Sequence, residues 1–293
     1  MNFGNVLTAM VTPFDENGKV DFQKTTDLIE HLLENGSDGL VIAGTTGESP
    51  TLTKEEKISL LKHTVKTVNQ RVPVIAGTGS NNTAASISFT KEAEACGADA
   101  IMLVVPYYNK PSQRGLYEHF ATIANATGLP VMLYNIPGRS VVKMDADTIV
   151  QLSKVENIVS VKEASGDIDL ISEVIERTND NFSVYSGEDS TTLPLLAVGG
   201  DGVISVASHV IGNEIQQMVS AFKSGNVSEA GALHRKLLPV MNGLFAAPSP
   251  SPVKAALSMK GINMGSVRLP LLELTDAEKQ VLKQTLNLVS VAK

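Results

Sequence analysis

Short apolar segments recur eight times along the chain, and stretches with helical periodicity separate them. Each segment is rich in Val, Ile and Leu and has the composition of a buried strand. Their starts lie roughly 20–35 residues apart, which leaves room for one helix after each strand. The eight predicted strands are residues 6–14, 39–47, 72–80, 100–108, 130–138, 157–165, 182–189 and 202–209.

The intervening stretches carry helix signals of their own. Residues 25–36 place their leucines and isoleucine on one face and end at Gly36, which is a favourable residue for stopping a helix. Residues 53–68 open with Thr53 and Glu56, the spacing of a capping box. Residues 91–97 end on Gly97 in the same way as the first helix.

This alternation predicts an α/β protein with a (β/α)8 TIM barrel. An open doubly wound sheet is the rival, but it would need fewer strands and a GxGxxG turn, which the sequence lacks. After residue 224 the strand signal stops, and residues 225–293 read as helices with a Pro/Ser-rich elbow at 247–252. Thr275 and Glu278 form a second capping box there. We therefore predict a catalytic barrel over 1–224 and a C-terminal helical domain over 225–293.

Composition limits the classes of partner. The chain has 293 residues, of which 43% are hydrophobic and 19% charged, and its net charge is −7. Without a basic run, nucleic acid and anionic membranes are poor partners, and no apolar run approaches the ~18 residues that span a bilayer. Cys96 is the single cysteine, so no internal disulfide can form. The first residues have no signal-peptide pattern, and we expect a mature cytoplasmic protein.

The chemistry of a TIM barrel lies at the carboxyl ends of its strands. Lys162 stands out there, because it ends the apolar strand 157–165. Strand alternation places Glu163 on the opposite face, and leaves the small residues Ser160 and Ala164 beside the lysine. These neighbours give the amine room and no charge, which favours a reactive lysine with a lowered pKa that attacks a carbonyl.

Other polar residues end neighbouring strands: Thr45, Thr46, Tyr108, Tyr134 and Arg139. Each has a structural interpretation, such as a helix cap for the threonines, a core aromatic for Tyr134 and a surface charge for Arg139. Their gathering on one rim favours a functional site. The five histidines have no metal-ligand spacing, and Glu188 and Asp189 are adjacent and should point in opposite directions, so we expect neither a metal site nor a carboxylate pair.

Five motifs carry a resemblance to a known family. GTTGES (44–49), PYYNKPS (106–112), YNIPGR (134–139), IVSVKEASG (158–166) and GVISVAS (202–208) are similar to those of the dihydrodipicolinate synthase family, within the pyruvate-dependent class I aldolases. The resemblance covers essentially the whole chain. PYYN and the arginine after YNIPG favour the synthase branch over the N-acetylneuraminate lyase branch.

The resemblance implies an activity and a role for each residue. It implies condensation of pyruvate with L-aspartate 4-semialdehyde, the first committed step of diaminopimelate and lysine biosynthesis, without metal or organic cofactor. Lys162 would form the Schiff base, and Tyr134 would move protons through a relay with Thr45 and with Tyr108 of a neighbouring subunit. The residues implied for carboxylate binding are Thr46 and the backbone of Ile204 for pyruvate, and Arg139 for the second substrate.

Assembly and regulation also follow from the resemblance. A shared Tyr108 implies a homo-oligomer, and the family implies a homotetramer built as a dimer of dimers. Some members are inhibited by L-lysine, which two histidines and a glutamate help to hold. Those positions here are Lys54, Lys57 and Ala85, although Ser49, Asn81 and Tyr107 match the pattern. We therefore expect a lysine-insensitive enzyme.

Two other functions stay open on the residues alone. Lys162 and Tyr134 would also serve a sister aldolase or lyase that acts on sugar acids, although Arg139 suits a carboxylate better than a hydroxyl-rich substrate. A catalytically idle barrel with a binding role is the third possibility, and the complete set of Lys162, Tyr134, Thr45 and Tyr108 argues against it.

Overall fold

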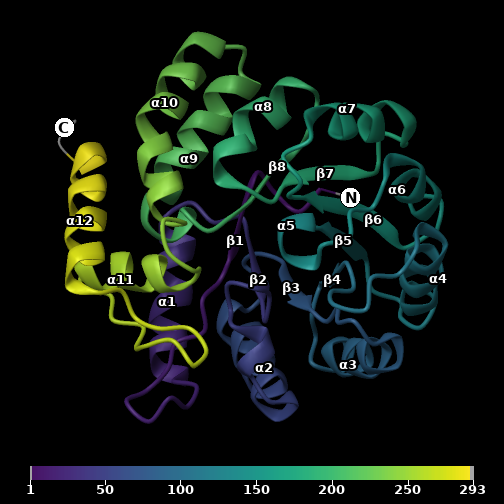
Figure 1. Ribbon diagram of the computed structural model, residues 1–293, viewed down its shortest axis with the longest axis horizontal. Helices are drawn as coiled ribbons and strands as arrows, with labels where there is room; N and C mark the ends of the chain where they lie inside the picture. The colour runs from purple at the N-terminus through teal and green to yellow at the C-terminus, as the bar shows by residue number, and fades with distance from the viewer. Residues whose placement is uncertain (1, 291–293) are drawn as a thin grey trace.

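The computed structural model describes residues 2–290 and contains a closed barrel of eight parallel strands (Figure 1). Each strand pairs with the next one along the chain, and β8 pairs with β1. The predicted TIM barrel is confirmed, but the strands are shorter than the apolar segments that predicted them. They are β1 (Val6–Ala9), β2 (Gly39–Ile42), β3 (Val74–Gly77), β4 (Ala100–Val104), β5 (Val131–Asn135), β6 (Ile158–Glu163), β7 (Ser183–Ser186) and β8 (Gly202–Ser205).

Helices follow the strands and surround the barrel. The predicted capping box of α2 is present: the Glu56 amide donates to the Thr53 hydroxyl, and the Thr53 amide donates to the Glu56 carboxylate. The helices are α1 (Phe22–Glu34), α2 (Lys54–Val68), α3 (Thr83–Ala95), α4 (Gln113–Ala124), α5 (Pro137–Ser140), α6 (Ala146–Leu152), α7 (Ile168–Arg177), α8 (Thr192–Ala197) and α9 (Ser208–Lys223), with short 3-10 turns η1 (Ser49–Thr51) and η2 (Asp189–Thr191).

Both faces of the strands are buried, as parallel sheets require. Residues that point outward pack under the helices in one large core, and Val161 belongs to it. Residues that point inward form a second, smaller cluster inside the barrel. Its buried members are Phe3, Leu7, Ala9, Val41, Ile75, Ala100, Met102, Met132, Tyr134, Ala164, Tyr185 and Ile204.

The barrel closes between β8 and β1 at a glycine. The Val203 amide donates to the Asn5 carbonyl over 2.9 Å. A Cβ atom at Gly202 would lie only 2.1 Å from that carbonyl oxygen, so the first and last strands can approach each other only without a side chain there.

Three further helices follow the barrel: α10 (Val227–Gly243), α11 (Ser251–Met259) and α12 (Asp276–Ser290). They lie at one side of the molecule, next to α9 and α1 (Figure 1). The capping box of Thr275 and Glu278 is present at the start of α12. Apolar residues of α10 and α11 join the same core as the barrel helices, so the division at residue 224 stays a proposal.

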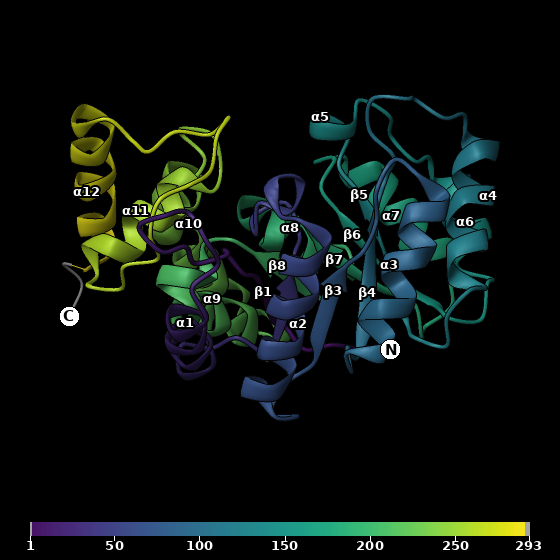
Figure 2. The same ribbon diagram turned by 90° about the horizontal axis from the view of Figure 1, so that it is seen from below.

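The structure also shows at which end of the barrel the carboxyl ends of the strands lie. Figure 2 shows α5, which follows β5, at the end of the barrel opposite to the N-terminus. The carboxyl ends of the parallel strands therefore share that end, and the predicted functional residues gather there. Within residues 2–290, no helix is long and apolar enough to cross a membrane.

Candidate active site

A cleft of about 270 Å³ opens at the carboxyl ends of β2 to β5. Thr45, Tyr134 and Arg139 line it, so three of the predicted site residues share one cavity. Gly77 also lines this cleft, and its backbone fits there only without a side chain, because a Cβ atom would lie 2.6 Å from the Ala43 carbonyl oxygen. A larger cavity, of about 1130 Å³, lies between α11 and the segment that precedes α1.

Lys162 is buried in the barrel, with 5% of its surface exposed. It pairs in register with Tyr134 on β5, and its ammonium nitrogen lies 4.3 Å from the centroid of the Tyr134 ring. Burial lowers the pKa of Lys162 to about 8 because it penalises the charged form, with the Asp189 carboxylate opposing the shift and the Arg139 charge reinforcing it. About a tenth of the amine is then neutral at pH 7, against ~0.03% for an ordinary lysine.

Tyr134 is a neutral phenol at physiological pH. It is 4% exposed, and burial raises its pKa to about 12, although the Arg139 charge and a hydrogen bond with Thr45 oppose the shift. Its hydroxyl can therefore give a proton to a reacting group and take it back, with Thr45 as its hydrogen-bonding partner. This pairing of Tyr134 with Thr45 is the local arrangement that a proton relay requires.

Glu163 lies on the opposite face of β6, as strand alternation predicts. Its carboxylate accepts from the Asn135 amide group over 2.8 Å and from the Ser165 backbone amide over 2.7 Å. Burial raises the pKa of Glu163, and these hydrogen bonds oppose the shift. Because its acceptors are used there, Glu163 does not neutralise Lys162.

The structure adds a charged neighbour that sequence analysis missed. Asp189, the first residue of η2, is 3% exposed, and its carboxylate accepts from the Ser205 hydroxyl and from the Val206 and Ala207 amides. Burial raises the pKa of Asp189, and the three donors oppose the shift. The carboxylate thus binds the loop after β8 and partly offsets the burial of Lys162 from a distance. Its neighbour Glu188 is exposed, so the two carboxylates diverge as expected.

Gly187 is a second residue near Lys162 that sequence analysis did not select. A Cβ atom there would lie 2.6 Å from the Ala164 Cβ and 3.2 Å from the Lys162 Cε. The absence of a side chain at Gly187 therefore makes room for the lysine chain beside β7.

The remaining predicted residues occupy different places around this centre. Thr46 is buried in the loop after β2, and Ile204 is buried in the inward cluster that contains Tyr134. Arg139 is exposed on α5 at the mouth of the cleft. Tyr108 is 90% exposed, has a φ of 72° and does not line the cleft, whereas its neighbour Tyr107 does. Tyr108 is thus available to another molecule rather than to this chain's own site.

The described part of the chain contains no set of side chains that could bind a metal ion. Among residues 2–290, no group of three or more His, Cys, Asp or Glu side chains is arranged to hold a metal ion. Two of the histidines, His119 and His209, are buried, and burial lowers the pKa of each to about 4.

Comparison with known proteins places this arrangement in a family. The model of the dihydrodipicolinate synthetase family matches residues 2–289. The chain belongs to this family. The 4-hydroxy-tetrahydrodipicolinate synthase of Oceanobacillus iheyensis is 60% identical over 287 residues, which cover 98% of this chain and 97% of that protein.

Solved members of the family have the same fold. A dihydrodipicolinate synthase of Bacillus anthracis superposes with a TM-score of 0.97 at 58% identity, and the match covers 98% of each chain. The enzyme of Cyanidioschyzon merolae, solved with lysine bound, superposes with a TM-score of 0.97 at 46% identity over 99% of each chain. Family and fold are therefore those that the sequence motifs predict.

The lowered pKa of Lys162 can be measured without any substrate. We expect the rate of reductive methylation of Lys162, followed by mass spectrometry of its peptide, to rise with pH and level off above about pH 8. The control is a short unstructured peptide with a single lysine, because an ordinary lysine should keep gaining reactivity up to pH ~10. Parallel profiles for the two peptides would contradict the expectation.

Proposed function

We propose that the chain condenses pyruvate with L-aspartate 4-semialdehyde, the reaction of 4-hydroxy-tetrahydrodipicolinate synthase. The observation that carries the proposal is the buried, readily deprotonated amine of Lys162 against the face of Tyr134, which itself pairs with Thr45. Relatives that are 58–60% identical over nearly the whole chain bear this enzyme's name, which favours it over a sugar-acid lyase or an idle barrel. The cytoplasmic location belongs to the same proposal.

The first steps use Lys162 and Tyr134. The neutral amine of Lys162 attacks the keto carbon of pyruvate, and the resulting hydroxyl leaves as water after it takes a proton from the Tyr134 phenol. The protonated imine draws electrons from the methyl group, and the Tyr134 phenolate takes a proton from that group, which gives an enamine and restores the phenol. The low-dielectric interior that lowers the pKa of Lys162 also keeps bulk water away from this intermediate.

The later steps use the mouth of the cleft. The enamine carbon attacks the aldehyde carbon of the second substrate, and the aldehyde oxygen takes a proton through the Tyr134–Thr45 pair. The substrate's own amino group then displaces Lys162 from the imine carbon, which closes the ring and restores the free lysine. These steps require no oxidant, reductant or metal.

Three residues would bind the carboxylate groups of the two substrates. Thr46 and the backbone of Ile204 would hold the pyruvate carboxylate next to Lys162. Arg139 would bind the carboxylate of the second substrate, because its planar guanidinium can donate two parallel hydrogen bonds and its position at the mouth faces incoming substrate.

The covalent step gives a direct test. Incubation with pyruvate and borohydride should add one reduced pyruvate adduct per chain, on the peptide that contains Lys162. Lys162→Ala should abolish the adduct and lower turnover by at least ~10³-fold while the protein stays folded, because it removes the nucleophile. An adduct on the peptide of Lys254, which is also deeply buried, would contradict the assignment. A side-by-side assay with sugar-derived aldehydes checks the substrate class.

Assembly is the second part of the proposal. Tyr108 is almost fully exposed, and the loop that bears it is fixed to the loop after β3 by a hydrogen bond from the Asn109 side chain to the Asn81 carbonyl. We propose that Tyr108 completes the proton relay of a second copy, so that a dimer is the smallest active unit and a homotetramer is the complete assembly.

Subunit mixing tests the shared site. Tyr108→Phe and Lys162→Ala homo-oligomers should each have little activity, whereas a mixture refolded together should regain part of it, because a hybrid dimer contains one site with both residues intact. Hybrid formation is verified by mass spectrometry of the intact assembly. Hybrids that form but stay as inactive as the parents would exclude the shared relay.

The structure sharpens the expectation of lysine insensitivity. Lys57 lines the cleft together with Ser49 and Tyr107, whereas the ammonium of Lys54 pairs with Glu92. Lys57 is therefore the main source of repulsion toward a cationic ligand. A close like-charge pair costs ~1 kcal/mol or more, depending on the effective dielectric, which lowers affinity by about tenfold.

We expect L-lysine to cause no saturable inhibition at millimolar concentrations. The Cyanidioschyzon merolae enzyme, which was solved with lysine bound, is the positive control for the binding measurement. The double variant Lys57→His/Ala85→Glu should gain lysine affinity, because it removes one positive charge and adds a carboxylate. Clear inhibition of the unmodified protein by lysine would refute the expectation.

A further inference from the structure

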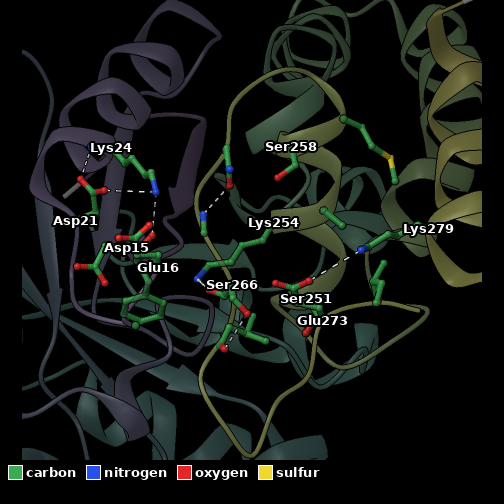
Figure 3. Close-up of a pocket in the computed structure, with 18 residues that line it drawn as sticks. Asp15, Glu16, Asp21, Lys24, Ser251, Lys254, Ser258, Ser266, Glu273 and Lys279 are labelled. Carbon is green, nitrogen blue, oxygen red and sulfur yellow. Dashed lines mark hydrogen bonds and ion pairs between the residues drawn. The ribbon is translucent and has the colours of Figure 1, made fainter. Parts of the chain in front are cut away.

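A buried ion pair joins the loop after β2 to helix α11, at the wall of the larger cavity. Figure 3 shows Lys254 extending from α11 across this cavity toward the segment that precedes α1. Its ammonium lies 2.8 Å from the Glu48 carboxylate and donates to the Ser266 carbonyl over 2.7 Å. Lys254 is 4% exposed and Glu48 2%, so both charges are removed from water.

Lys254 has further contacts around its ammonium. Besides Glu48 and Ser266, it lies 4.2 Å from the centroid of the Phe14 ring, and the guanidinium carbon of Arg268 lies 4.4 Å from the same centroid. Phe14 is 1% exposed. Because each donor of a buried ammonium must be satisfied, this set of partners fixes the position of the amine and of the carboxylate that it holds.

Glu48 connects Lys254 to the turn of the candidate active site that carries Thr45. Its second carboxylate oxygen accepts from the Arg268 amide over 2.9 Å, and its own amide donates to the Thr45 carbonyl over 3.1 Å. Glu48 has a φ of 55°, a left-handed conformation that costs free energy for a residue with a side chain. The turn that carries Thr45 and Thr46 is thus held in a strained shape by partners about 200 residues further along the chain.

The rest of the turn is anchored on the barrel side. The Thr12 hydroxyl donates to the Gly47 carbonyl over 2.7 Å. Arg268 also makes a two-pronged contact with Glu56 in the first turn of α2, with distances of 2.6 and 2.8 Å. The segment from Lys254 to Arg268 therefore forms ion pairs and hydrogen bonds with both ends of the connection between β2 and α2.

We propose that the Glu48–Lys254 pair positions Thr45 and Thr46 for catalysis, so that the C-terminal helices support the active site rather than only covering the barrel. The inference rests on the proposed function for its catalytic consequence. The pair touches no substrate, and its role is to hold the hydroxyl of Thr45 within reach of Tyr134. A buried ion pair is a poor source of stability compared with apolar residues of the same size, which fits a role in specifying geometry.

The test compares Lys254→Met with Val253→Ala. Lys254→Met keeps an unbranched chain against Phe14 but leaves Glu48 buried without its cation. Val253 is fully buried on the same helix, and its truncation loosens α11 without changing the contacts of Glu48. The double variant Glu48→Gln/Lys254→Met removes both charges and provides the rescue, since no unpaired carboxylate is left behind.

We expect Lys254→Met to lower kcat and the rate of pyruvate adduct formation by about 10- to 100-fold, the effect of a misplaced catalytic group. The measurement is made well below the melting temperature of each variant. Hydrogen–deuterium exchange at the Glu48 and Ser49 amides should speed up on the order of tenfold. The double variant should recover part of both losses, and Val253→Ala should show neither, even if its melting temperature falls as far.

Two results would overturn the inference. One is unchanged exchange and catalysis in Lys254→Met, and the other is an equal loss in Val253→Ala, which would mean that general loosening of α11 explains the effect. Failure of the proposed function itself would look different, because the unmodified protein would then form no pyruvate adduct, or would form it without turning over L-aspartate 4-semialdehyde. The exchange at residues 48 and 49 would still decide whether the pair holds the turn.

Discussion

The burial of one amine inside a closed parallel barrel is the constraint on which the rest of this structure depends. A lysine at the end of an interior strand loses most of its hydration, and only weak and indirect compensation is provided by Asp189 and by the face of Tyr134. The fold tolerates this because the amine can become neutral. Gly187, which leaves space, and Ala164, which adds no charge, serve the same end.

Comparison of Lys162 with Lys254, which is also deeply buried, shows that a lowered pKa alone does not mark a catalytic residue. Burial lowers the pKa of both Lys162 and Lys254 to about 8. Both ammonium groups lie over an aromatic ring, but Lys254 also donates to a carboxylate and a carbonyl, whereas the ring beside Lys162 belongs to Tyr134, which lines the cleft at the strand ends. Geometry, rather than acidity, separates a structural lysine from a nucleophilic one.

The sequence predicted the barrel and most of the rim because both depend on local patterns. Alternation along β6 was enough to separate Lys162 from Glu163. Strand ends were placed too late, because apolar residues such as Met10 and Val11 continue into buried connections that the hydrophobic pattern cannot distinguish from strand. The contact of Asp189 with Ser205 and the contact of Glu48 with Lys254 could not be predicted, because the paired residues lie 16 and 206 positions apart in the sequence.

The closure of the barrel between β8 and β1 has a consequence for how the protein is made. During synthesis the N-terminal strands leave the ribosome first, but β1 has an open edge until Gly202 and its neighbours arrive to pair with it. Lys162 emerges before the wall that will bury it is complete, so it is an ordinary hydrated, protonated lysine at that time. The nascent chain therefore carries Lys162 in its protonated form, and the lowered pKa of this amine develops only when folding completes the barrel.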